Sequence, residues 1–493
     1  MENKKVLSGF IWRFLERISA HGVSFIVSVV LARLLDPAVY GTVALVTVLT
    51  ALLQTFIDSG FGNALIQKKD ADDLDFSSVF YFNIFISVVA YAGLFAAAPF
   101  IAKFYEIPAL TDIVRVQGLI LFVAGAKNVQ QAYISRHMEF KKFFWATLVG
   151  TLASAVVGLV MALNGFGVWA LVAQSLVNPL IDTMVLWTVV KWRPKLMFSF
   201  SRLKTLFSYG WKLLAVGLID RLYNNARQLI IGKMNTEDLA FYNKGKQFPA
   251  LIIDNTIASI DSVLLPALSQ EQDKLDRVRQ MTRRSIKTGT YLLAPMMLGF
   301  AACSAPIVRI LLTEKWLPCV PFLVVFCITN IFHSIFTSNY NAYKALGRTD
   351  VYLKINTTQK IMGFSVLLCT MWFGVMAMTY SMLFTSAINQ LITTHPNKKL
   401  LGYGYREQLG DILPTLLLAG FMGVTVYLVT LLRLNDFVTL AIQVPLGVAI
   451  YIAGSKLLKI DSFDYILSIV KGLFKKNENT VRESICHFLR IRH

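Results

Sequence analysis

The stretch FIWRFLERISAHG, residues 10–22, opens a long apolar run that reaches Leu35 and yet contains side chains that lipid rejects. These side chains are Arg13, Glu16, Arg17 and His21. A run of about 20 apolar residues is long enough to cross a bilayer as a helix. Each Lys, Arg or Asp at the centre of such a helix costs about 2.5–3.5 kcal/mol to insert. The stretch therefore predicts a membrane-spanning helix with one face turned away from lipid.

The composition of the whole chain is that of a polytopic membrane protein. Of 493 residues, 55% are hydrophobic and only 16% are charged, whereas soluble domains contain about 25% charged residues. Apolar runs of spanning length, divided at polar, Gly or Pro turns, predict about fourteen transmembrane helices in an all-α bundle. The predicted spans are 9–35, 39–66, 77–98, 111–134, 143–163, 166–190, 205–232, 239–265, 286–312, 318–343, 354–374, 376–394, 409–432 and 437–455. The basic start MENKKVLSGF precedes an apolar run too long for a signal peptide, which favours an uncleaved first span.

Lysine and arginine gather in alternate loops, and this alternation predicts the orientation. The loops around 68, 136–142, 191–204, 274–284, 344–348 and 398–406 are basic, whereas the intervening loops contain few cations. By the positive-inside rule, both termini are cytoplasmic. The net charge of +19 is then mainly topological, and nucleic acid is excluded as a partner. The basic tail, 457–493, is predicted to be an amphipathic helix on the inner leaflet, or equally a peripheral packing helix.

The chain contains a weak internal repeat. The segments SGFIWR (8–13), LARLLDPAVYG (31–41) and DSGFGNALIQ (58–67) correspond to SYGWKL (208–213), IIGKMNTEDLAFYN (230–243) and DSVLLPALSQ (261–270). Each copy holds six predicted spans, so both would insert in the same orientation, with a substrate site at their interface. We expect an N-lobe at 1–200, a C-lobe at 201–400, two further spans at 401–456 and the tail at 457–493.

Charged and polar residues form stripes along four of the predicted spans. Arg13, Arg17 and His21 repeat every four residues on one helical face, and the second, seventh and eighth spans carry similar polar groups. Insertion of spans seven and eight facing lipid would cost on the order of 10 kcal/mol, so these stripes are predicted to line a cavity. The candidate substrate-binding cations are Arg13, Arg17, Lys212, Arg221, Arg227, Lys244 and Lys246. The candidate ion-coupling acids are Asp58, Asp220, Asp254 and Asp261.

A cavity rich in Lys and Arg favours phosphate or pyrophosphate as its ligand. The same charges also fit two simpler roles. Arg13 and Lys212 lie near helix ends, where they can reach lipid headgroups. Asp220 or Asp254 can also pair with Arg221 in a purely structural core.

Motifs for catalysis or metal binding are absent from the sequence. There is no Walker A motif, no G-x-S-x-G and no His spacing typical of zinc sites. The five cysteines form no C-x-x-C pair. The run DADDLD, 70–75, is interpreted as a solvated turn and not as a metal-binding loop. We expect a protein that is not an enzyme and that has neither cofactor nor metal.

Several of these segments resemble the Wzx-type polysaccharide exporters of the multidrug/oligosaccharidyl-lipid/polysaccharide flippase superfamily, in particular the colanic acid and teichuronic acid exporters. The resemblance rests on LARLLDPAVYG, DSGFGNALIQ, LIIGKMNTEDLAFYNKGKQFPALI and VLLPALSQEQDKLDRVRQMTRRS. It implies a two-lobed bundle in the bacterial cytoplasmic membrane that uses alternating access. The implied cargo is an undecaprenyl-pyrophosphate-linked oligosaccharide, moved from the inner to the outer leaflet for cell-surface polysaccharide such as O-antigen or lipopolysaccharide.

The expected partners are a lipid-linked oligosaccharide, membrane lipids, a coupling proton or Na⁺, and other membrane proteins of polysaccharide assembly. Two rival functions remain. A small-molecule or drug antiporter of the same superfamily would favour acidic sites, whereas this predicted cavity is net basic. A membrane glycosyltransferase or polymerase would typically carry a large external loop, and the predicted external loops are short.

Overall fold

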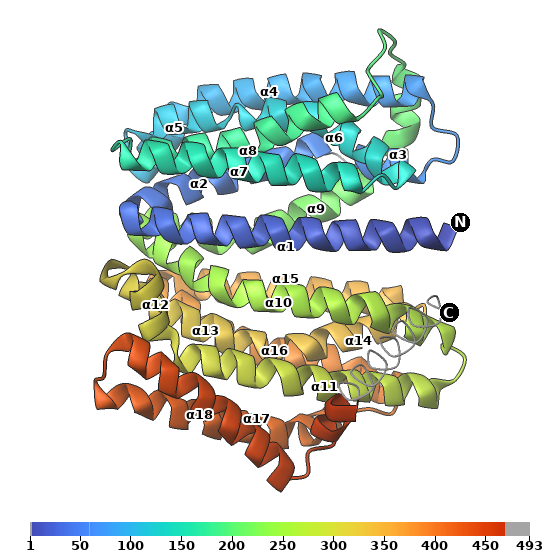
Figure 1. Cartoon of the computed structure of the whole chain (residues 1–493). Helices are drawn as coiled ribbons and strands as arrows, with labels where there is room; N and C mark the ends of the chain where they lie inside the picture. Colours follow the sequence, from blue (N-terminus) through green and yellow to red (C-terminus); the bar gives the residue numbers. More distant parts are fainter. Residues whose placement is uncertain (1, 59, 469–493) are drawn as a thin grey trace, which may run out of the picture. The chain divides into compact units, whose positions relative to one another are not determined.

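The computed structural model describes residues 2–58 and 60–468, and the secondary structure of this part is helical throughout (Figure 1). The helices are α1 (Glu2–Leu34), α2 (Pro37–Asp58), α3 (Phe61–Gln67), α4 (Asp73–Tyr105), α5 (Leu110–Gln117), α6 (Ile120–His137), α7 (Lys141–Leu163), α8 (Val168–Val189), α9 (Phe200–Met234), α10 (Thr236–Gln270), α11 (Leu275–Ala302), α12 (Ser304–Leu312), α13 (Val320–Asn330), α14 (His333–Ala345), α15 (Thr349–Thr370), α16 (Val375–Leu400), α17 (Tyr405–Val429) and α18 (Asp436–Leu457), with short 3-10 helices at Glu314–Cys319, Met371–Phe373 and Thr430–Leu432.

The predicted spans correspond to these helices in chain order. Most of them coincide with single helices, while others cover consecutive pieces, such as α5 with α6 and α11 with α12. Eight helical segments of the described part are long and apolar enough to cross a membrane, some of them built from consecutive helices. The pair α11 and α12 forms a further candidate that is bent by 66°. The predicted all-α membrane bundle is therefore confirmed. The charged helices α9 and α10 are each 35 residues long, more than the length a span requires.

Local sequence signals explain where several helices begin and end. Pro37 starts α2 at a position where its missing N–H costs nothing. Gly60, with φ +70°, separates α2 from α3. The side chain of Asp72 accepts a hydrogen bond from the Asp75 backbone N–H, and Asp75 accepts one from Asp72 in return. This capping box starts α4.

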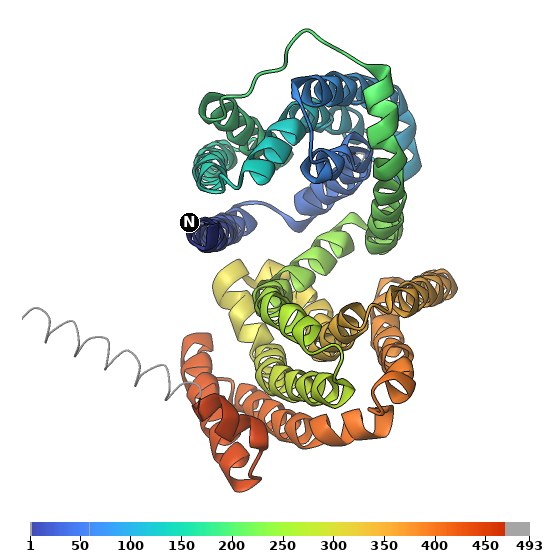
Figure 2. The same cartoon turned by 90° about the vertical axis from the view of Figure 1, so that its right-hand side faces the viewer.

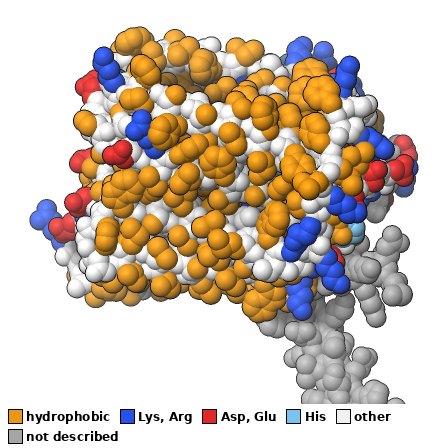
Figure 3. All heavy atoms as spheres, turned by 90° about the horizontal axis from the view of Figure 1, so that it is seen from above, with side chains coloured by type: hydrophobic (Ala, Val, Ile, Leu, Met, Phe, Trp, Pro, Cys, Tyr) orange, Lys and Arg blue, Asp and Glu red, His pale blue; other side chains and the backbone are white. Residues whose placement is uncertain are grey.

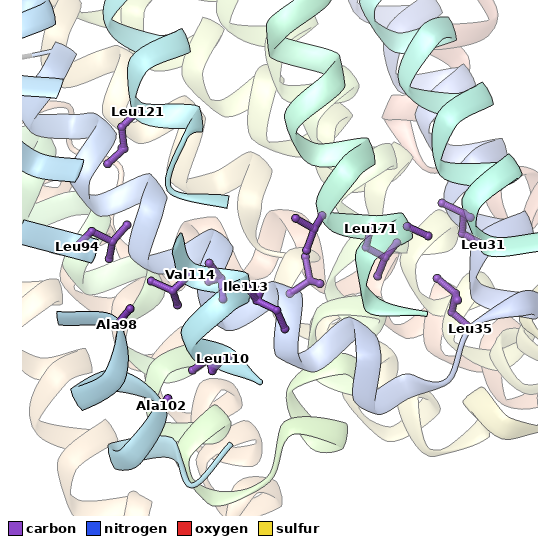
Figure 4. Close-up of a cluster of buried hydrophobic side chains, with 14 of the residues drawn as sticks. Leu31, Leu35, Leu94, Ala98, Ala102, Leu110, Ile113, Val114, Leu121 and Leu171 are labelled. Carbon is purple, nitrogen blue, oxygen red and sulfur yellow. The ribbon is translucent and has the colours of Figure 1, made fainter. Parts of the chain in front are cut away.

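The helices group into two compact units, Met1–Asn243 with Leu311–Cys319 and Lys244–Ile310 with Val320–His493. In the first unit, α7 packs against α1 and α8, α4 against α5 and α6, and α2 against α9. A buried apolar cluster joins α1, α4, α5, α6 and α8 (Figure 4). Its members include Leu31, Leu94, Ile113, Leu121 and Leu171, each at most 7% exposed. The predicted lobe boundary between residues 200 and 201 stays a prediction.

The second unit is built around α11. This helix packs against α13, α14 and α17, while α17 packs against α18 and α15 against α16. Figure 2, which looks along the helices, shows each unit as a bundle of helices running beside one another. An apolar cluster that includes Leu268, Ile286, Ile335 and Tyr403 joins α10, α11 and α14 in this unit.

Large apolar side chains are exposed along the helices, as expected of a lipid-facing surface. Trp372 is 80%, Phe373 78% and Phe100 74% exposed. The face shown in Figure 3 carries hydrophobic side chains across its middle and charged side chains toward its two ends. Contiguous apolar surface of this kind suits lipid and not water. The protein is therefore a multi-pass membrane protein.

The predicted amphipathic tail lies largely outside the described residues. The backbone is helical over 461–468, immediately after α18. Residues 469–493 are not part of the described structure, so the tail's membrane contact stays a prediction.

Candidate functional site

The first unit contains a polar cavity of about 710 Å³. Its wall is formed by α2, α6, α8 and α9, together with Asn243 of α10. The polar residues of the lining are Tyr40, Thr47, Lys127, Gln174, Ser175, Asn178, Arg221, Asn225, Gln228 and Asn243. Apolar residues of α2, α6 and α8 complete the wall. Small-molecule sites typically combine an apolar wall with a few convergent polar groups.

An ion pair between α6 and α8 supplies one charge of this cavity. The ammonium group of Lys127 donates a hydrogen bond to the carboxylate of Asp182. The side chains of Lys127 and Asp182 are 20% and 7% exposed. Burial of either charge alone would be strongly unfavourable, so removing one partner of the pair would be costly. Neither residue is among the predicted site residues. The only sign of this pair in the sequence is a single Lys in the fourth predicted span and a single Asp in the sixth.

Asp58 and Arg221, both predicted site residues, are brought together in the same unit. Asn128 of α6 donates a hydrogen bond to Asp58, with 3.1 Å between Nδ2 and Oδ1. The positive charges of Arg221 and Lys127 both act on the Asp58 carboxylate. Arg221 lines the cavity, and its side chain is exposed. The acid at the end of α2 thus lies near two cations.

Amide side chains dominate the rest of the polar lining. Gln174 and Asn178 lie one turn apart on α8, while Asn225 and Gln228 lie one turn apart on α9. Gln228 donates to Asn225 over 3.2 Å, and Asn225 donates to the Arg221 carbonyl oxygen over 2.8 Å. Each amide offers both a donor and an acceptor. Gln174 and Asn178 were not predicted, because single amides in an apolar run stand out less than charges do.

The other predicted residues of α9 have different surroundings. Arg227 is half-buried and hydrogen-bonds the side chain of Tyr242, which is buried. Lys212 is exposed, and Asp220 is half-buried. None of these three residues lines the polar cavity. Their predicted roles in binding or coupling stay predictions.

The side chains of Arg13 and Arg17, the first two residues of the stripe predicted on the first span, lie outside the described residues. The backbone there is helical, as predicted. His21 of the same stripe is exposed. The substrate-binding role of the two arginines stays a prediction.

The remaining predicted residues belong to the second unit. Lys244 is 5% exposed and hydrogen-bonds Gln247 one turn further along α10, over 3.3 Å. Lys246 is exposed. Asp261 accepts a hydrogen bond from Asn341 of α14 over 2.7 Å. The charges of Asp254 and Asp261 both act on His333, a residue that the predicted stripes did not include.

A buried network of amides and hydroxyls holds α14, α16 and α17 together in this unit. Asn397 donates to Asn339 over 2.6 Å, Asn339 to Gln408 over 3.2 Å, and Thr394 to Gln408 over 3.1 Å. These four side chains are fully buried. Polar groups in such positions need internal partners because lipid offers none.

The part of the chain that the structure describes contains no group of three or more His, Cys, Asp or Glu side chains that could bind a metal ion. The acidic run 70–75 instead caps α4 and pairs with nearby cations. Asp75 binds Lys68 over 2.6 Å, and Asp73 binds Lys195 over 2.5 Å.

The sequence is similar to those of several known proteins. The chain is 25% identical over 306 residues to the succinoglycan biosynthesis transport protein ExoT of Rhizobium meliloti (strain 1021), and the match covers 62% of each chain. It is 22% identical to the lipopolysaccharide biosynthesis protein WzxC of Escherichia coli (strain K12), covering 85% of this chain and 88% of WzxC. The match thus spans less than two thirds of ExoT but most of WzxC.

The fold is similar to a solved structure of the lipid II flippase MurJ in an inward closed conformation. The TM-score is 0.73 at 14% identity, covering 92% of this chain and 99% of MurJ. At this identity the likeness concerns the fold alone. The family model described as "Polysaccharide biosynthesis protein" matches residues 30–321, more than half of the chain. The chain therefore belongs to this polysaccharide biosynthesis protein family, in agreement with the resemblance seen in its motifs.

Proposed function

We propose that this protein moves an undecaprenyl-pyrophosphate-linked oligosaccharide from the inner to the outer leaflet, for the synthesis of cell-surface polysaccharide. The observation that carries the proposal is the cavity of the first unit, which combines amides, hydroxyls and the cations Lys127 and Arg221 inside a membrane protein. Family membership and the fold shared with MurJ support it. The relatives ExoT and WzxC are proteins of succinoglycan biosynthesis transport and of lipopolysaccharide biosynthesis, respectively.

The cavity chemistry fits the two polar parts of such a cargo. Sugar hydroxyls both donate and accept hydrogen bonds, as do the amides of Gln174, Asn178 and Gln228. A pyrophosphate prefers the guanidinium group of Arg221, which presents several donors in one plane. The polyprenyl chain stays in lipid while the head group crosses. Alternating access through this cavity is the mechanism that we infer.

The same lining disfavours the drug-antiporter alternative. A cationic drug needs an acidic partner, but Asp182 is bound to Lys127, and Asp58 lies near both Arg221 and Lys127. A cargo cation would have to compete with these fixed charges. A neutral group such as a sugar meets no such competition.

Leaflet-resolved translocation in proteoliposomes tests the proposal directly. A lipid-pyrophosphate oligosaccharide should move with the wild type, and Arg221→Ala should slow it about 10- to 100-fold, since a hydrogen bond to a charged group contributes about 1.5–3 kcal/mol. Arg406→Ala, at an exposed arginine of α17 outside the cavity, is the matched control. If the wild type moves no such cargo, the proposed function is wrong. If Arg221→Ala matches the control, the function stands and the arginine is structural.

Ion coupling forms a separate part of the proposal. Candidate carriers are Asp58, Asp220, Asp254 and Asp261, with a proton or Na⁺ as the coupling ion. Replacing each acid with Asn keeps its size and removes its charge. Loss of the response to an imposed pH or Na⁺ gradient is expected in at least one variant. An unchanged response in all four would exclude coupling through these acids.

A further inference from the structure

A second polar cavity, of about 610 Å³, lies between α15 and α16 in the second unit. Its walls come from the first turns of α15 and the last turns of α16, which pack against each other. The charged or titratable groups at this cavity are Arg348, Asp350, Lys354, His395 and Lys399. None of these residues belongs to the site described above.

The charge of this cavity is positive and partly uncompensated. Arg348 and Asp350 neutralise each other through two hydrogen bonds of 2.9 Å. Lys354 and Lys399 form no ion pair within the described residues, and both side chains are exposed. His395, one turn before Lys399, adds a ring that can donate a hydrogen bond. Two ammonium groups therefore line a cavity whose carboxylate, Asp350, is already bound to Arg348.

The same cavity has an apolar side. Ile355 is a buried residue of its lining, and Leu391, 47% exposed, continues the wall along α16. Further along the same two helices, Ile361 is 64% and Phe384 59% exposed, as lipid-facing residues are. A ligand seated here would thus meet cations at one end and an apolar surface at the other.

We propose that the groove between α15 and α16 binds an anionic membrane phospholipid, with its phosphate between Lys354 and Lys399 and its acyl chain along the apolar wall. Charge complementarity and the adjoining lipid-facing surface both argue for this occupant, since basic pockets between transmembrane helices suit lipid phosphates. By the distribution of loop charges, this end of the helices faces the inner leaflet. The site is independent of the cargo cavity.

Binding of defined lipids to the full-length protein in neutral detergent tests this site. Phosphatidylglycerol and phosphatidylcholine are titrated separately, with native mass spectrometry as the readout. The wild type should bind phosphatidylglycerol more tightly. Lys354→Gln/Lys399→Gln should weaken phosphatidylglycerol binding about 10- to 30-fold, because both of the positive charges that attract the anionic headgroup are removed. The control Lys456→Gln/Lys459→Gln removes two exposed lysines at the end of α18.

Several outcomes would overturn the inference. Equal binding of the two lipids by the wild type would show that no anionic site exists. Equal losses in the test and control variants would show that the attraction is diffuse and not localised in this groove. Binding of soluble glycerol 3-phosphate as tight as that of phosphatidylglycerol would identify a phosphate site and not a lipid site. Lys354→Arg/Lys399→Arg should restore binding, which separates lost charge from a folding defect.

Discussion

The ion pair of Lys127 and Asp182 shows how this chain keeps charge inside a membrane bundle. Removing only the lysine leaves an unpaired carboxylate that is 7% exposed. We expect Lys127→Met to lower the free energy of unfolding by about 3–5 kcal/mol, and Lys127→Met/Asp182→Leu to recover most of that loss. Thermal unfolding in detergent measures both. A double variant no more stable than the single one would show that the pair is not the cause.

Gly41 illustrates a second constraint on single residues, a close backbone approach. A Cβ atom at Gly41 would stand 1.8 Å from the carbonyl oxygen of Thr236, at the start of α10. Gly41→Ala should therefore destabilise the protein by about 1–3 kcal/mol, since the two backbones must separate. Gly93→Ala in α4 is the control, because nothing lies within 4 Å of its Cβ position. Equal melting temperatures for the two variants would contradict this expectation.

Single residues also show where sequence reasoning stops. The charge of Arg221 and its position on α9 were visible in the sequence, and so was the likeness of Asp58 to Asp261. The partnership of Lys127 with Asp182 was not visible, since it joins residues 55 positions apart on different helices. The amides Gln174 and Asn178 were also missed. Hydropathy places a residue in a helix but does not say which helix it faces.

Among the helices, α4 is stabilised by a hydrogen-bonded cap at its N-terminus. Asp72 accepts a hydrogen bond of 2.9 Å from the Asp75 backbone N–H, and this bond is the main reason that the pKa of Asp72 is lowered. Asp72→Ala should cost about 1 kcal/mol at neutral pH, because the cap is lost. Asp72→Asn should cost less, because an Asn side chain caps as well as Asp does. Chemical or thermal unfolding of the three proteins compares these losses.

The same cap predicts how the stability of the protein changes at low pH. A carboxyl whose pKa is lowered by folding stabilises the protein above its unfolded value of about 3.9. That contribution disappears as the pH falls through the lowered pKa of Asp72. Asp72→Asn cannot titrate, so below about pH 4 it should lose less stability than the wild type does. If the stability of the two proteins changed with pH in the same way, the charge of Asp72 would have no role in stability at low pH.

Helix positions were the best-predicted feature of the elements. The run 9–35 became α1 and the run 437–455 lies within α18, because length and hydropathy suffice to identify a span. The interruptions were not predicted. The 66° bend between α11 and α12 follows Ala302. Pro306 stands four residues later and lacks the N–H that would continue the helix to the Ala302 carbonyl. Hydropathy does not register such a break, although the proline that accompanies it is visible in the sequence.

For the whole molecule, the repeat and the compact units divide the chain at different places. The repeat predicts halves of six spans each, whereas α9 packs with α2, α3 and α4 in the first unit. The repeat is predicted from similarity between two stretches of sequence, whereas the compact units reflect where each helix buries its surface. The halves and the compact units are therefore distinct descriptions of one chain.

The alternation of basic loops makes the orientation of every segment testable. Alkaline phosphatase fused after Gly165 or Gly374 should be active, because the positive-inside rule places these loops outside the cytoplasm. Fusions after Arg348 or Lys399 should be inactive, and green fluorescent protein at the same four positions should give the opposite pattern. A reversed pattern throughout would invert the orientation. Identical results after Arg348 and Gly374 would mean that α15 does not cross the membrane, and the count of fourteen spans would then be wrong.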